Sequence, residues 1–157
     1  MKIVLLQTGK TGEKYISEGV SEYSKRVRKY IAFEIITIPD IRNTKSMPVA
    51  EQKSREGRQI LGQVSGDDLV FLLDERGREY STTAFASMME KSFNMSKKRI
   101  VFVIGGPWGF SDEVYARADR KISLSQLTFS HQMVRLLFAE QLYRILSVIN
   151  GAPYHHD

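Results

Sequence analysis

The sequence predicts an α/β fold, a largely parallel sheet flanked by helices. Three observations support this expectation. Short apolar segments rich in β-branched residues alternate with segments in which apolar residues recur every three or four positions. No segment reaches the roughly 18 apolar residues of a membrane-spanning helix. The 157 residues, 42% of them hydrophobic, show no internal repeat or linker, so we expect a single domain over residues 1–157.

The clearest strand is Ile100 to Ile104, five apolar residues that we expect to be buried on both faces. It stops at Gly105-Gly106-Pro107, which cannot continue a strand. Ser111 then opens a helix with acidic residues in its first turn. Because open α/β sheets bind ligands where their strands end, this turn is a candidate ligand edge. The glycines alone fit a plain strand-to-helix turn equally well.

The other elements follow from the same patterns. The third strand is expected to end at Leu73, before the polar residues 74–77. Phe85, Met88 and Met89 recur at helical spacing after Ser81, and we expect them to pack in the core. The predicted strands cover 2–7, 33–38, 69–73, 100–104 and 122–125, and the predicted helices cover 13–29, 48–64, 81 onward, 111–119 and 130–149.

The last predicted helix, which Ser130 caps, is apolar around most of its circumference. That arc is wider than the ~100° stripe that a surface helix needs. We therefore expect it to be buried on more than one side, with a partner subunit as the second cover.

Positive charge is concentrated in the first part of the chain. Residues 1–60 hold 12 Lys/Arg against 7 Asp/Glu, whereas the remainder is balanced, so the net charge of +5 is one-sided. Such a field suits a polyanion such as RNA, although a solvated basic surface is the simpler alternative. Lys25 and Arg26 lie in the last turns of the first predicted helix, where their positive charges interact favourably with the negative end of the helix dipole. They can also contact phosphate.

Several chemistries are disfavoured by what the sequence lacks. Without cysteine there is no disulfide or thiolate metal site, and the histidines (His131, His155 and His156) have no metal-binding spacing, so we predict no metal. There is no GxSxG nucleophile motif. The segment Thr8–Thr11 lacks the first glycine of a P-loop.

The best ligand edge is instead formed late in the chain, where Leu73, Gly105-Gly106 and Leu124–Phe129 follow three strands. These segments are mostly small or apolar and uncharged, which suits an adenosine-like group better than a triphosphate. His131 and Arg135 lie four residues apart on one helix face just beyond this edge. A neutral histidine there can orient or deprotonate a base, or simply bond to backbone at the helix start.

Four separated segments carry a resemblance to a known family. They are FVIGGPWG (102–109), LSQLTFSH (124–131), RLLFAEQLYR (135–144) and APYH (152–155). In this order they resemble the RlmH family, small SPOUT-class methyltransferases, and the likeness also covers MKIVLLQTGK at the start and Arg55-Glu56-Gly57. Two positions depart from the usual pattern, Ser130 before the histidine and the ending His156-Asp157.

The resemblance implies a C-terminal trefoil knot, a homodimer and a cytoplasmic enzyme. Its implied activity is S-adenosylmethionine-dependent methylation of N3 of a pseudouridine in 23S ribosomal RNA, in the context of the ribosome. The alternative is a non-catalytic RNA-binding or ribosome-associated protein of the same fold. The implied cofactor-binding residues are Leu73, Gly105, Gly106, Leu124, Ser125, Gln126, Leu127, Thr128 and Phe129. The implied catalytic residues are His131, Tyr154 and His155, and the implied RNA-binding residues are Arg135, Arg144, Lys25 and Arg26.

Overall fold

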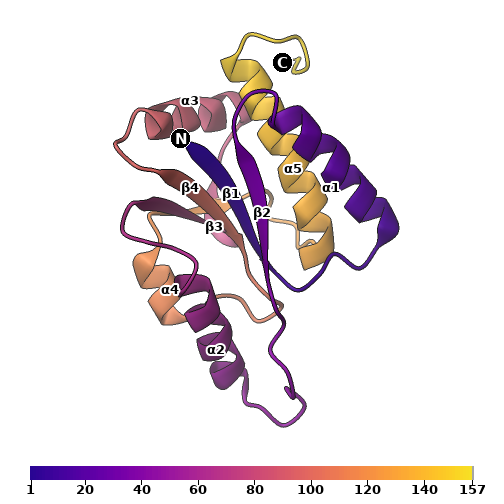
Figure 1. Ribbon diagram of the computed structural model, residues 1–157, viewed down its shortest axis with the longest axis vertical. Coiled ribbons are helices and arrows are strands. Elements are labelled where there is room, and N and C mark those ends of the chain that lie inside the picture. The colour runs from indigo at the N-terminus through magenta and orange to yellow at the C-terminus, as the bar shows by residue number, and fades with distance from the viewer. Residues whose placement is uncertain (157) are drawn as a thin grey trace.

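The computed structural model describes residues 1–156 as a parallel sheet between two layers of helices (Figure 1). The strands are β1 (Lys2–Thr8), β2 (Phe33–Ile38), β3 (Asp68–Glu79), β4 (Arg99–Ile104) and β5 (Arg120–Ser123). The helices are α1 (Lys14–Val27), α2 (Val49–Leu61), α3 (Thr82–Phe93), α4 (Asp112–Arg117) and α5 (His131–Ile149). The predicted α/β fold is confirmed.

The strand order is β2-β1-β4-β3-β5, and every neighbouring pair is parallel. Strand β4 is central, and Phe102 stands in register with Leu5 on one side and Phe71 on the other. Because parallel strands cannot be joined by tight hairpins, each connection carries a helix or a long loop across the sheet. The carboxyl ends of all five strands therefore meet at one edge.

Side chains along β4 alternate between two apolar cores. Ile100, Phe102 and Ile104 pack on one face of the sheet, and Val101 and Val103 pack on the other. Helices α1, α3 and α5 cover the first face and α2 and α4 cover the second (Figure 1). Burial on both faces is why this strand is apolar without interruption.

Strand β3 is the main departure from the expected boundaries. The prediction that it ends at Leu73 is wrong, because it continues to Glu79 with an irregularity between Leu73 and Arg78 where it pairs with β5. A Cβ added at Gly77 would lie 2.6 Å from the backbone nitrogen of Ile122. This close approach of two backbones needs glycine, and the polar sequence DERGRE gave no apolar signal for a strand.

The predicted helix starts are confirmed. The hydroxyls of Ser81, Ser111 and Ser130 each accept a hydrogen bond from the backbone N–H three residues later. Phe85, Met88 and Met89 are buried as expected. Helix α5 packs against α1 and α3, yet Met133, Leu136 and Leu137 on its first turns remain partly exposed.

Candidate functional site

A cavity of about 390 Å³ lies at the carboxyl edge of the sheet, where β3 and β4 end. The loop between β5 and α5 and the first turn of α5 complete it. Its lining is largely apolar, and no Lys or Arg of the described residues lines it. The lining residues are Leu73, Asp74, Glu75, Ile104, Gly105, Gly106, Pro107, Gly109, Phe110, Leu124, Ser125, Leu127, Thr128, Phe129, Ser130, His131 and Val134.

The cavity gathers most of the residues predicted for the late ligand edge. Of the nine predicted cofactor-binding residues, all but Gln126 line it. His131, exposed at the start of α5, lines it too. The volume lies within the 300–1,000 Å³ that is typical of small-molecule sites.

The glycine turn after β4 is held from behind by α2. The Glu56 carboxylate accepts a hydrogen bond from the Gly106 N–H at 2.8 Å, and a Cβ at Gly106 would lie 2.6 Å from Glu56 Oε2. Burial raises the pKa of the Glu56 carboxyl, the Gly106 N–H lowers it, and the charge of Asp40 raises it further. A side chain at 106 would therefore displace the end of the Glu56 side chain from the Gly106 N–H.

The loop 124–130 is ordered by its own hydroxyls. The Ser123 hydroxyl donates to the Ser125 carbonyl at 2.8 Å, and the Leu127 N–H donates to Ser125 Oγ at 3.0 Å. The Thr128 hydroxyl donates to the Glu75 carboxylate at 2.8 Å and so joins the loop to the extension of β3. Leu127, at the tip, is 72% exposed. The loop therefore presents apolar and backbone groups to the cavity.

Two acidic residues at the cavity, Asp74 and Glu75, were not predicted as site residues. Asp74 accepts a hydrogen bond from the Tyr115 hydroxyl of α4 at 2.5 Å. Burial, and then this bond to Asp74, raise the pKa of Tyr115 to about 12. The hydroxyl is therefore a donor at any physiological pH, and it fixes one carboxylate at the wall of the cavity.

The start of α5 is fixed to the turn that follows β1. Gln132 accepts a hydrogen bond from the Gly12 N–H at 2.9 Å and donates to the Lys10 carbonyl at 3.2 Å. Arg135 donates to the Thr8 carbonyl at 2.7 Å and to the Thr11 hydroxyl at 2.9 Å.

Arg135 is only 1% exposed, and burial lowers the pKa of its guanidinium. The expectation that it contacts RNA is therefore corrected. Because its side chain is turned inward, it contributes to holding His131 at the cavity instead.

Tyr154 and His155 lie in a second cluster, at the other end of α5. The Tyr154 hydroxyl donates to Glu140 Oε1 at 3.1 Å, and its ring packs on Tyr143 with centroids 4.6 Å apart. Burial and hydrogen bonds to Tyr23 and Glu140 raise the pKa of Tyr154. Glu140 is nine residues from His131, about 13 Å along the helix axis, so within one chain the three predicted catalytic residues are not together.

Arg144 and Arg26 belong to this tail cluster, which we define as Tyr23, Arg26, Glu140, Tyr143, Arg144, Tyr154 and His155. Arg144 donates to Glu140 at 2.6 Å, approaches His155 Nδ1 at 3.3 Å and lies over the Tyr154 ring. Arg26 lies over the rings of Tyr23 and Tyr143. The ion pair and the ring contacts hold both guanidiniums in place, and Arg26 remains partly exposed.

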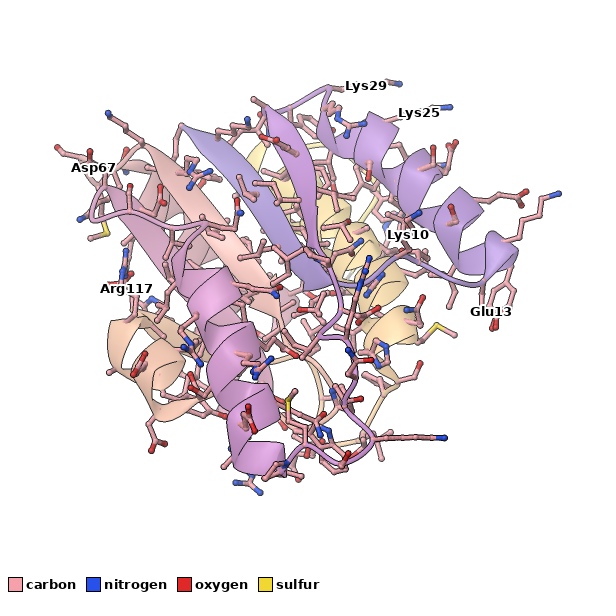
Figure 2. All side chains as sticks on the ribbon, turned by 60° about the horizontal axis from the view of Figure 1, so that its bottom comes forward. Lys10, Glu13, Lys25, Lys29, Asp67 and Arg117 are labelled. Carbon is pink, nitrogen blue, oxygen red and sulfur yellow. The ribbon has the colours of Figure 1, made fainter. Side chains whose placement is uncertain are left out.

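Lys25 lies at the same end of the molecule. Figure 2 shows Lys25 and Lys29 at one end of α1 and Glu13 at the other. Helix α1 runs back along the sheet after β1, so its last turns lie beside the start of the strands. The predicted RNA-binding Lys25 and Arg26 are therefore at the edge of the sheet opposite the cavity.

Within residues 1–156 no group of three or more His, Asp and Glu residues is arranged to hold a metal ion. Among the same residues, no helix is long and apolar enough to cross a membrane.

Known proteins resemble this chain over its whole length. Ribosomal RNA large subunit methyltransferase H of Parabacteroides distasonis is 48% identical over 157 residues, covering 100% of both chains. The protein of the same name from Christiangramia forsetii is 51% identical over 156 residues, covering 99% of both.

Two solved structures share the fold at 13% sequence identity. A probable methyltransferase from Bordetella pertussis Tohama I matches with a TM-score of 0.55, covering 92% of this chain and 94% of the other. A Legionella pneumophila protein in complex with bound SAM matches with a TM-score of 0.51, covering 94% of this chain and 66% of the other. The model of the family described as "Predicted SPOUT methyltransferase" matches residues 1–155. The chain therefore belongs to the SPOUT methyltransferase family.

Proposed function

We propose that this protein transfers a methyl group from S-adenosylmethionine to ribosomal RNA of the large subunit, at N3 of a pseudouridine in 23S RNA. The observation that carries the proposal is the full-length likeness, 45–51% identity, to proteins named Ribosomal RNA large subunit methyltransferase H. The exact nucleotide and atom come from the resemblance of the four sequence segments to the RlmH family. The proposed subcellular location of the enzyme is the cytoplasm, where ribosomes are found.

The chemistry of the cavity fits the cofactor. S-adenosylmethionine has an uncharged adenosine and a cationic sulfonium, and the cavity offers apolar side chains, glycine backbone and the carboxylates Asp74 and Glu75. The absence of Lys and Arg among the described lining residues disfavours a triphosphate, for which cations are the usual partners. When bound, S-adenosylmethionine supplies a methyl group that is already activated for direct transfer.

The residues of this chain then have to orient the acceptor and manage its proton. His131 is exposed at the cavity and free to accept a proton or a hydrogen bond from the base. A hydroxyl such as that of Tyr154 can stabilise charge on a uracil carbonyl. Correct positioning by itself is worth several kcal/mol. The proposed RNA contacts are Arg26 and Arg144 of the tail cluster and Lys25, which lies at the same end of the molecule.

We further propose that the active site is completed by a second copy of the chain. His131 and the tail cluster lie at opposite ends of α5, so one chain cannot bring both to a single nucleotide. Two copies packed antiparallel along their α5 helices would lay each tail over the partner's cavity. The partly exposed Met133, Leu136 and Leu137 provide the apolar surface that such packing needs.

Two further features of the fold belong to this proposal. We infer that residues 1–157 form one domain and that the C-terminal part is threaded as a trefoil knot. The support for the knot is the match of residues 1–155 to the SPOUT methyltransferase family.

Methyl transfer is tested with tritium-labelled S-adenosylmethionine on 70S particles, isolated large subunits and free 23S RNA, followed by nucleoside mass spectrometry. Label in N3-methylpseudouridine is the expected result. Titration of the cofactor by calorimetry distinguishes the alternative, because a non-catalytic RNA-binding protein has no need of it. No transfer to any of the three substrates, with the cofactor bound, would favour that alternative.

The composite site is tested by mixing two variants. His131→Ala removes the group at the cavity and Tyr154→Phe removes the hydroxyl of the tail, and each homodimer is expected to lose about 100-fold in turnover. After subunit exchange, half of the sites in each heterodimer are intact, so about a quarter of the wild-type activity should return. A mixture no more active than its parts would contradict the proposal.

A further inference from the structure

A second hollow, of about 750 Å³, lies between the loop that follows β2 and helix α2. The loop provides Asp40, Arg42 and Asn43, and the helix provides Arg55, Arg58 and Gln59. We call this hollow the arginine groove. It is nearly twice as large as the cavity at the glycine turn and far more basic.

The charge of the arginine groove is largely unneutralised. No acidic side chain of residues 1–156 forms an ion pair with Arg42 or Arg58, and both are exposed. Arg55 pairs with Glu51 at 2.7 Å, but both side chains are about half exposed, so the pair contributes little and is readily exchanged. The acid of the groove, Asp40, has its carboxylate against Gly9 at the end of β1.

The groove also contains an unused acceptor. Gln59 Oε1 is buried and accepts no hydrogen bond within the described residues. Because this oxygen is buried, a hydrogen-bond donor of a bound molecule would reach it only after the Gln59 side chain turned toward the groove. Ribose hydroxyls and base N–H groups are such donors, whereas a simple inorganic anion has none to offer.

Helix α2 connects the groove to the cavity. Glu56 of α2 accepts from Gly106 at the cavity wall, and Gln52 accepts from the indole N–H of the exposed Trp108 at 3.2 Å. Arg55 and Arg58 lie within one turn of Glu56 on the neighbouring face of the same helix. An RNA chain bound in the groove would thus pass within about one helix diameter, roughly 10 Å, of the glycine turn.

We propose that the arginine groove binds the phosphate backbone of the RNA next to the nucleotide that enters the cavity. The proposal rests on the proposed function. It adds the path that the RNA backbone takes across the surface of the protein. Three guanidiniums along one open groove match a polyanion, because each can bind a phosphate through two hydrogen bonds.

The test compares two variants that lose the same charge. The groove variant is Arg42→Gln, Arg55→Gln and Arg58→Gln, and the control is Lys91→Gln, Lys97→Gln and Lys98→Gln, at the edge of the sheet where β4 begins. Affinity for protein-free 23S RNA and for 70S particles is measured by filter binding over a range of salt. Melting temperature and cofactor affinity are measured for both variants, which should match the wild type.

The groove variant is expected to bind both RNA and particles at least tenfold more weakly, with the slope of log K against log salt reduced by about 2. On particles its KM should rise while kcat at saturating substrate is retained. Equal affinity of the groove variant and the control would overturn the proposal. Weaker binding to particles alone, with RNA affinity unchanged, would also overturn it and assign the groove to an acidic ribosomal protein.

A failure of this proposal can be distinguished from a failure of the proposed function. Binding is measured without turnover, so a groove variant that binds RNA more weakly than the control, in a protein that transfers no methyl group, would contradict the proposed enzyme and still support the groove. If the wild type transfers methyl groups while both variants bind RNA alike, the proposed enzyme is supported and the groove is contradicted.

Discussion

The Glu56 carboxylate accepts a hydrogen bond from the Gly106 N–H at 2.8 Å, so helix α2 supports the wall of the cavity from outside it. Glu56 does not line the cavity. Its effect on the site is carried by the backbone of the glycine turn. Glu56 is therefore a positioning residue. It is identified by its hydrogen bond to the glycine turn and not by its distance from a substrate.

Replacing Glu56 should weaken cofactor binding. Glu56→Ala leaves the Gly106 N–H without its acceptor and frees the turn, and we expect the Kd for S-adenosylmethionine, measured by calorimetry, to rise about tenfold, or 1.4 kcal/mol. Glu56→Gln keeps an acceptor oxygen and should rescue most of the loss. Glu51→Ala, an exposed position one turn earlier on α2, is the matched control. An alanine variant that binds as tightly as the wild type would remove Glu56 from the site.

The same carboxyl makes stability depend on pH. Because burial raises the pKa of Glu56, its contribution to stability is complete below its ordinary pKa and is lost as the pH rises through the raised value. The Glu56→Gln variant has no proton to lose. Urea unfolding should therefore show the variant gaining stability relative to the wild type between pH 4 and pH 8. A constant difference across that range would contradict this.

Asp68 should behave in the opposite way. It is 2% exposed and accepts two hydrogen bonds from Arg99, which hold the pKa of its carboxyl below the usual range. Its contribution is present above the ordinary pKa of about 4 and disappears as the pH falls through the lowered value. Asp68→Asn should cost about 2 kcal/mol of unfolding free energy at pH 7 and much less near pH 2. Asp67→Asn, in a surface pair, should change little at either pH.

Tyr115→Phe tests the carboxylate at the cavity wall. Losing the hydroxyl that donates to Asp74 at 2.5 Å frees the Asp74 side chain, and cofactor affinity should fall about threefold to tenfold. A spectroscopic signature accompanies this. Because burial and the bond to Asp74 raise the pKa of Tyr115 to about 12, wild type and variant should show equal phenolate absorbance up to about pH 11, and above it the wild type should ionise one more tyrosine than the variant.

Gly77→Ala should destabilise the fold. Its Cβ would lie 2.6–2.7 Å from the backbone of Lys121 and Ile122, which cannot move without displacing β5. We expect a loss of about 2 kcal/mol or more in urea unfolding. Gly66→Ala is the control, since nothing lies within 4 Å of the added carbon there. Equal stability of the two variants would mean that the two segments can separate freely.

Much of the cavity was predictable because its wall is made of strand ends. Leu73, Gly105 and the segment 124–129 follow segments whose apolar patterns identify strands, and the parallel fold brings those ends to one edge. The serine caps were equally readable, because the hydroxyl bonds to a backbone group only three residues away.

Interactions between distant segments left no such pattern. Glu56 reaches Gly106 across 50 positions and Tyr115 reaches Asp74 across 41, and neither pair has a periodic signal. The RNA-binding role expected for Arg135 came from the family resemblance, and helical spacing placed it only on the same helix face as His131. That spacing identifies a helix face but does not say that the turn after β1 covers it.

The hydrogen bonds of Gln132 to Gly12 and to the Lys10 carbonyl join positions 120 and 122 residues apart. During synthesis, the first loop to emerge must therefore wait for almost the entire polypeptide before it reaches its final arrangement. Contacts so far apart in sequence close slowly. A nascent chain halted before residue 132 could build much of the sheet and still be unable to bind any ligand at its carboxyl edge.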